Sequence, residues 1–231
     1  MTPARIAGLL YVAMGLPAVY ALQYVPRVLV VRSDAAATAA NVRDSEWMLR
    51  SAIGAELLSA TIFIFTALAL YRLFRDVARH QAVLMVIFVL VSVPITFVAV
   101  LPETAALTVL GADYLSVFDG AQRDAVALFL LRVHGQVLAV AQIFWGLWLV
   151  PLGILAYRSG FVPRIVGVLL PIAAVGYIGQ SLVALVTPQL TDLGNLAAIL
   201  EAGEISIVVW LLFSRRGAPA LTRAVGQPAA A

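Results

Sequence analysis

The chain of 231 residues contains no cysteine and no lysine, and only 12% of its residues are charged. The absence of cysteine excludes disulfides, thiol nucleophiles and thiolate metal sites. A soluble domain is about one quarter charged, whereas this chain is 63% hydrophobic, so most of its surface is expected to face lipid. The fifteen arginines are scattered at the ends of apolar runs and form no basic stripe. Nucleic acid is therefore not an expected partner. The lipid bilayer is an expected partner, because most of the surface is apolar.

Six apolar runs follow one another along the chain, at 6–25, 52–71, 82–101, 136–157, 165–186 and 195–213. Each is about long enough to cross a bilayer as a helix, and lipid offers no partner for the unpaired backbone groups of an open sheet. The expected fold class is all-α: a polytopic six-transmembrane-helix bundle over residues 1–216, with a disordered cytoplasmic tail at 217–231. The first run is expected to remain a span and not a cleaved signal peptide, because its apolar character continues through Val25.

Arginine sets the direction of the spans. Successive connections between the spans lie on opposite sides of the membrane. The connections on one side are rich in arginine and hold a single acid, Asp76, whereas those on the other side hold most of the acids. The positive-inside rule then predicts that both termini are cytoplasmic. The arginines of the inner set are Arg5, Arg72, Arg75, Arg79, Arg158, Arg164, Arg215, Arg216 and Arg223.

The two long connections, 26–51 and 102–122, are expected on the outer side, and the second of them includes Glu103. Asp119 and Gln122 have the spacing of a capping box, so the fourth helix is predicted to begin near Gly120 and to project beyond the hydrocarbon. On the inner side, Gly160 suits the left-handed end of that helix, and Pro163 suits the first turn of the next one.

Several short motifs resemble a bacterial family of integral membrane proteins known as domain of unknown function 4386. The motifs are RIAGLLY at 5–11, FWGLWL at 144–149, LG at 152–153, RSGFVPR at 158–164, GVLL at 167–170, GEIS at 203–206 and WLL at 210–212. The resemblance implies a helical bundle in a bacterial plasma membrane. It implies no activity, because the family has none assigned.

Glu56, Glu201 and Glu204 lie inside apolar runs, where an acidic side chain is costly and normally faces a bundle interior or a wet cavity. Counting about 1.5 Å per residue from the inner arginines places polar residues of all six runs in one layer between the midplane and the outer face. Arg132 and His134 stand above that layer and point in different directions, so one of the two is expected to face the glutamates. The predicted ligand-binding residues are Glu56, Glu201, Glu204, His134, Arg132, Gln142, Gln180 and Tyr177.

Three functions fit this layer. The leading hypothesis is an acidic pocket that opens outward and binds or transports a small cationic or protonated ligand. A second is a membrane-embedded hydrolase acting on lipid head groups, with glutamates and His134 in acid–base or metal roles. A third is an accessory or sensory subunit whose polar core only holds the helices together. No cofactor and no metal is assigned, because the chain has no HExxH motif, and the oligomeric state cannot be read from the sequence.

Overall fold

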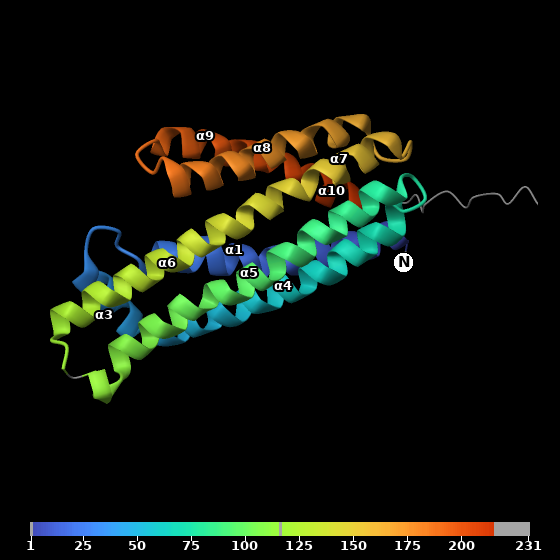
Figure 1. Ribbon diagram of the computed structural model, residues 1–231. Coiled ribbons are helices and arrows are strands. Elements are labelled where there is room, and N and C mark those ends of the chain that lie inside the picture. Colours follow the sequence, from blue (N-terminus) through green and yellow to red (C-terminus); the bar gives the residue numbers. More distant parts are fainter. Residues whose placement is uncertain (1, 116, 215–231) are drawn as a thin grey trace, which may run out of the picture.

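The computed structural model describes residues 2–115 and 117–214, and over these residues it is helical without a strand (Figure 1). Six helical segments are long and apolar enough to cross a membrane, which confirms the predicted fold class. Arg215, Arg216, Arg223 and the predicted tail at 217–231 lie outside the described residues. The elements are α1 (Pro3–Val19), η1 (Tyr20–Tyr24), α2 (Val25–Leu29), α3 (Ala35–Asp44), α4 (Glu46–Phe74), α5 (Arg79–Gly111), η2 (Asp113–Leu115), α6 (Gly120–Leu147), α7 (Leu149–Arg158), α8 (Arg164–Val186), α9 (Thr191–Glu201), η3 (Ala202–Glu204) and α10 (Ile205–Phe213).

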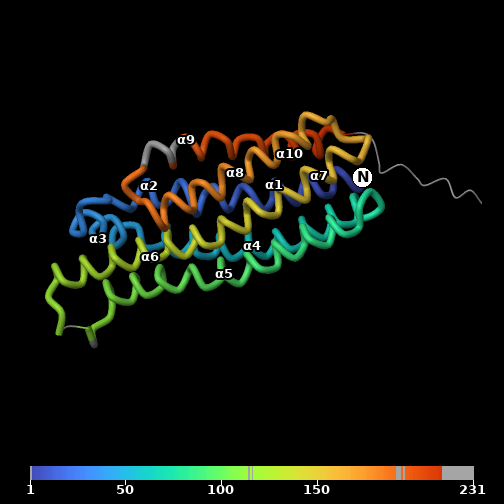
Figure 2. The backbone as a smooth tube through the Cα atoms, turned by 45° about the horizontal axis from the view of Figure 1, so that its top comes forward, coloured from blue at the N-terminus to red at the C-terminus, as the bar shows by residue number. Residues whose placement is uncertain are grey.

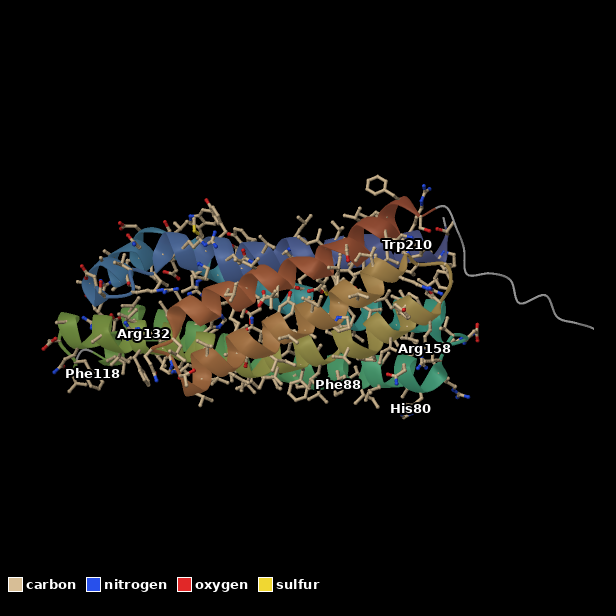
Figure 3. All side chains as sticks on the ribbon, turned by 90° about the horizontal axis from the view of Figure 1, so that it is seen from above. His80, Phe88, Phe118, Arg132, Arg158 and Trp210 are labelled. Carbon is tan, nitrogen blue, oxygen red and sulfur yellow. The ribbon has the colours of Figure 1, made fainter. Side chains whose placement is uncertain are left out.

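The connections alternate between the two ends of the bundle as predicted. Figure 3 labels His80, Arg158 and Trp210 at one end, close to the N-terminus, and Phe118 and Arg132 at the other. Figure 1 and Figure 2 both show α8, α9 and α10 grouped along one side of the bundle. The first group of residues marks the end that we expect to be cytoplasmic, and the orientation itself stays a prediction.

The third span extends further than predicted. α5 continues through Pro102 to Gly111 over 33 residues, so Glu103 lies within a helix and not in an outer loop. A proline inside a helix removes one backbone hydrogen bond and need not end the helix when good helix formers follow. Here an alanine- and leucine-rich stretch follows Pro102, and Glu103 is buried at 4% exposure. The fourth span runs 39 residues, from Gly120 to Arg158, and is about 58 Å long at the usual helical rise.

The sixth span changes its winding halfway. α9 ends at Glu201, one 3-10 turn forms η3, and α10 continues from Ile205. A 3-10 turn has about 3.0 residues per turn, so residues three apart lie directly above one another. Glu201 and Glu204 are therefore aligned along the helix axis. The sixth segment long and apolar enough to cross a membrane, Leu196–Phe213, agrees with the predicted run at 195–213, and α9 begins four residues before that run, at Thr191.

The predicted helix ends are largely confirmed. The Asp119 side chain accepts from the backbone of Gln122 at 2.8 Å, and the Gln122 side chain accepts from the backbone of Asp119 at 3.0 Å. Gly160 has a φ of 70°, as a left-handed helix end requires. Pro163 precedes the first residue of α8 and does not lie within its first turn.

The half of the bundle that we expect to face the cytoplasm is closed by an apolar core. The Trp148 ring, 1% exposed, packs edge-on against Phe63 with ring centroids 4.9 Å apart. Tyr11 lies beside the same indole, with its ring centroid 5.7 Å away. Trp148 is also the point where α6 breaks into α7. The aromatic rings therefore form a floor that separates this core from the polar residues of the other half of the bundle.

Candidate functional site

A cavity of about 1720 Å³ lies above this floor, between α1 and α4 on one side and α6, α8 and the last span on the other. Its rim at the end marked by Arg132 in Figure 3 is formed by exposed residues that include Arg27, Arg32 and Arg132. Its floor includes Tyr11, Phe63 and Trp148. If the predicted orientation holds, the cavity opens toward the outer side.

All eight residues predicted as ligand-binding line this cavity. The helices bring them into two groups. Glu201, Glu204, Gln142, Gln180 and Tyr177 form one group, and Glu56 and His134 belong to the other. Whether any of them binds a ligand stays a prediction.

Glu204 is held by two tyrosines from different helices. The Tyr177 hydroxyl of α8 donates to Glu204 Oε2 at 2.7 Å, and the Tyr11 hydroxyl of α1 donates to Glu204 Oε1. Tyr11 reaches the carboxylate because α1 packs closely against α10, where Gly8 faces the backbone of Leu211. Both carboxylate oxygens are thus oriented by donors that carry no charge.

Glu201 belongs to an amide network. The Gln142 side chain of α6 donates to Glu201 Oε1 at 3.3 Å and also to the side-chain oxygen of Gln180 on α8. The network links three helices through groups that are only partly buried. Nearby, the buried Ser181 hydroxyl donates to Ala139 O at 2.6 Å, which ties α8 to α6 beside the site.

The second group joins Glu56 of α4, Glu103 of α5 and His134 of α6. His134 Nε2 lies 3.5 Å from Glu56 Oε2 and 3.6 Å from Glu103 Oε1. His134 Nδ1 lies 3.0 Å from Ala99 O. One ligand atom from each of the three side chains falls within 4.8 Å of the others, so this group could hold a metal ion.

His134, and not Arg132, faces the glutamates. The two residues differ by about 200° of helical rotation, and only the histidine is buried. Arg132 is exposed at the rim and donates to the backbone carbonyl of Arg32. It therefore ties the fourth span to the loop that follows the first.

Sequence reasoning missed Glu103 and Tyr11. The predicted apolar run ends at 101, which places Glu103 in the outer connection, although Thr96, seven residues earlier, lies on the same face of α5. Tyr11 lies about 9 Å above Arg5, below the predicted polar layer, and reaches Glu204 only through the length of its side chain. A depth count of Cα positions leaves out that reach.

The acidic groups of the cavity lie in its interior, apart from the arginines at its rim. Four carboxylates line its interior, those of Glu56, Glu103, Glu201 and Glu204, and His134 is the basic group among them. Among the described residues, neither Glu201 nor Glu204 has an arginine or histidine nitrogen within 4.0 Å. The arginines that line the cavity lie at its rim.

Comparison with known proteins identifies the family. The family model described as domain of unknown function (DUF4386) matches residues 6–214. The chain belongs to this family. Within it, the two polar groups lie on the spans that the match covers.

This DUF4386 member is also similar to a protein of Archaeoglobus fulgidus that is described as an uncharacterized protein. The two are 28% identical over 158 residues, which cover 66% of this chain and 76% of the relative. No solved structure matches the chain. The bacterial origin and the plasma-membrane location stay predictions.

Proposed function

We propose that this protein binds a small cationic ligand, such as one carrying a protonated amine, in the acidic cavity, with Glu204 as its main contact. The observation that carries the proposal is the geometry of Glu204. Its carboxylate lies in the cavity wall, is oriented by Tyr11 and Tyr177, and has no basic partner within 4.0 Å among the described residues. Glu201, one 3-10 turn away, would flank the same cation.

Hydrogen bonds from neutral tyrosines fix the direction of a carboxylate without neutralising its charge. In a partly buried site a counter-ion is therefore favoured. An ammonium group about 4 Å from one carboxylate would gain about 4 kcal/mol at an effective dielectric constant of about 20. Part of this attraction offsets the desolvation of the two charges and the lost freedom of the ligand, and only the remainder contributes to the binding free energy.

The wall of the cavity is mainly apolar, with polar side chains besides these acids, and its floor is aromatic. Small-molecule sites commonly combine an apolar lining with a few fixed polar groups. Trp148 and Phe63 would contact the hydrocarbon part of a ligand, and an aromatic face attracts a cation within about 6 Å. The arginines at the rim would contact an anionic group if the ligand carries one.

The test uses purified full-length protein in detergent micelles, with choline and putrescine as cationic probes and glycerol as the neutral one. At ten times the dissociation constant a bound probe stabilises the protein by about 1.4 kcal/mol. For a chain of this size that equals a rise in melting temperature of about 3–6 °C. The rise should occur with a cationic probe at matched ionic strength and not with glycerol.

Two variants locate the site. Glu204→Gln should abolish the rise caused by the cationic probe, because it removes the charge and keeps the shape. Glu46→Gln is the matched control, since Glu46 is exposed at the start of α4 and pairs with Arg50 four residues later. Equal melting shifts in the wild type and in Glu204→Gln would remove this proposal. The absence of any shift would favour the accessory-subunit hypothesis.

A further inference from the structure

Glu56, Glu103 and His134 form a second site whose chemistry differs from that of Glu204. They come from three helices, and their side chains are 3%, 5% and 7% exposed in that order. Glu56 Oε1 and Glu103 Oε2 are buried and have no hydrogen-bond partner among the residues that the structure describes. Buried carboxylate oxygens in native proteins are nearly always bonded, so this pair indicates a missing partner.

The orientation of the histidine explains why the three groups do not satisfy one another. His134 Nδ1 lies 3.0 Å from the carbonyl oxygen of Ala99, and a carbonyl can only accept. Nδ1 therefore carries the proton, and in the neutral ring the lone pair of Nε2 faces the glutamates. When both glutamates are ionised, Nε2 and the carboxylate oxygens are all acceptors. Their separations of 3.5 and 3.6 Å exceed hydrogen-bond length.

We propose that Glu56, Glu103 and His134 bind one divalent first-row transition-metal ion, with zinc as the ion that fits best. Zinc bonds to histidine nitrogen and carboxylate oxygen are about 2.0–2.2 Å long. Two ligands of a tetrahedral zinc are consequently about 3.3–3.6 Å apart. The two separations from Nε2 fall at the upper end of that range, and one ligand atom of each of the three residues lies within 4.8 Å of the others.

Charge and surroundings agree with this assignment. Two carboxylates and a neutral imidazole balance a divalent ion, which leaves no net charge in the bundle interior. Metal-bound histidines almost always donate their other ring N–H to a carboxylate or a backbone carbonyl, as His134 does to Ala99. All three side chains also line the cavity, so an ion can enter from it.

Three protein ligands leave one tetrahedral position open. Zinc sites with three protein ligands and an open position are of the catalytic type, whereas structural zinc sites are closed by four ligands. The open position would face the cavity and be taken by water or by a ligand atom. The zinc site does not depend on cation binding at Glu204, because it uses different side chains.

The experiment uses full-length protein purified in detergent with an affinity tag that contains no histidine. The protein is stripped with a chelator, desalted, incubated with zinc and desalted again, and its metal content is measured by elemental analysis. About one zinc per chain is expected in the wild type. With cobalt as a spectroscopic probe, the intense visible absorption of a four-coordinate site should appear and be displaced by zinc.

Variants assign the ligands. Glu103→Gln and His134→Gln should each weaken zinc binding by about 100-fold or more, since changes outside the ligand shell already cost 10- to 100-fold. Glu46→Gln and Glu204→Gln should keep the full zinc content. The wild-type measurement stands even if a variant fails to fold.

Two results would overturn the site. One is folded wild-type protein that retains less than about a tenth of an equivalent of zinc and shows no four-coordinate cobalt spectrum. The other is zinc that is lost from Glu204→Gln but kept by Glu103→Gln. Neither result bears on the melting shifts with choline or putrescine, so the two proposals fail separately.

Discussion

Replacing Gly176 by alanine should disturb the position of Glu201 through a single added methyl group. Gly176 lies where α8 crosses α9. A Cβ at this position would lie 2.6 Å from Ala197 O, 3.0 Å from Leu200 Cβ and 3.1 Å from Glu201 N. The contacted atoms are backbone or the start of a side chain, so no flexible group can move out of the way.

The size of the effect follows from these distances. Ordinary van der Waals contact begins at 3.4 Å, so α9 would have to move by about 0.8 Å at this crossing. Forcing an extra carbon into a packed contact typically costs 1–3 kcal/mol. The higher helix propensity of alanine offsets about 0.5–1 kcal/mol of that cost. We expect a net loss of up to about 2.5 kcal/mol in the free energy of unfolding, with a central value of about 1 kcal/mol.

Gly54→Ala is the control, because Gly54 lies inside α4 and a Cβ there would meet nothing within 4 Å. Unfolding of both variants in mixed micelles, followed by circular dichroism, gives the free energies. Gly54→Ala should equal or slightly exceed the wild type, whereas Gly176→Ala should fall below it and also bind the cationic probes more weakly. Equal stability of the two variants would refute the close crossing of α8 and α9.

Three further predictions concern the packing, one helix start and the orientation. Ser181→Ala removes a buried hydroxyl that donates to α6, and it should lower the free energy of unfolding by about 0.5–1.5 kcal/mol. Thr61→Val is the control, because its hydroxyl is exposed and bonds within its own helix, and it should change little in the same unfolding assay. Asp119→Ala breaks the capping box and should destabilise the first turn of α6 by about 0.5–2 kcal/mol. The loss should appear as faster amide hydrogen exchange in that turn, and unchanged protection would contradict the prediction. Because the chain has no cysteine, single replacements report the orientation. In intact cells a membrane-impermeant maleimide should label Asp113→Cys and not Asp76→Cys, and the reverse pattern would show that the positive-inside reading is wrong.

The sequence predicted the spans well because span formation is a local property. Hydropathy over about 20 residues decides whether a helix enters lipid, and neighbouring helices change that little. The capping box at Asp119 and the left-handed Gly160 are local for the same reason, since each depends on a few consecutive residues. The common depth of Glu56, Gln142 and Glu201 follows from the regular rise of a helix.

Local properties did not predict which side chains meet. The direction of a side chain turns by about 100° per residue, so one irregular turn changes every contact beyond it. Between the mid-helix Pro17 and Val25 the first span widens into the π-helical turn η1, and the last span tightens into η3 beside Glu204. The continuation of α5 through Pro102 depends on packing as well, and it brings Glu103 to His134.

The sequence by itself determined a six-span helical bundle with acids inside its apolar spans. Only the tertiary structure decided that these acids separate into two sites, Glu204 with Tyr11 and Tyr177, and Glu56 with Glu103 and His134. The physical reason is that hydropathy and helical rise act along one segment. The rotation of each helix is set by close packing against its neighbours, as at Gly176, and by side chains that reach across the bundle.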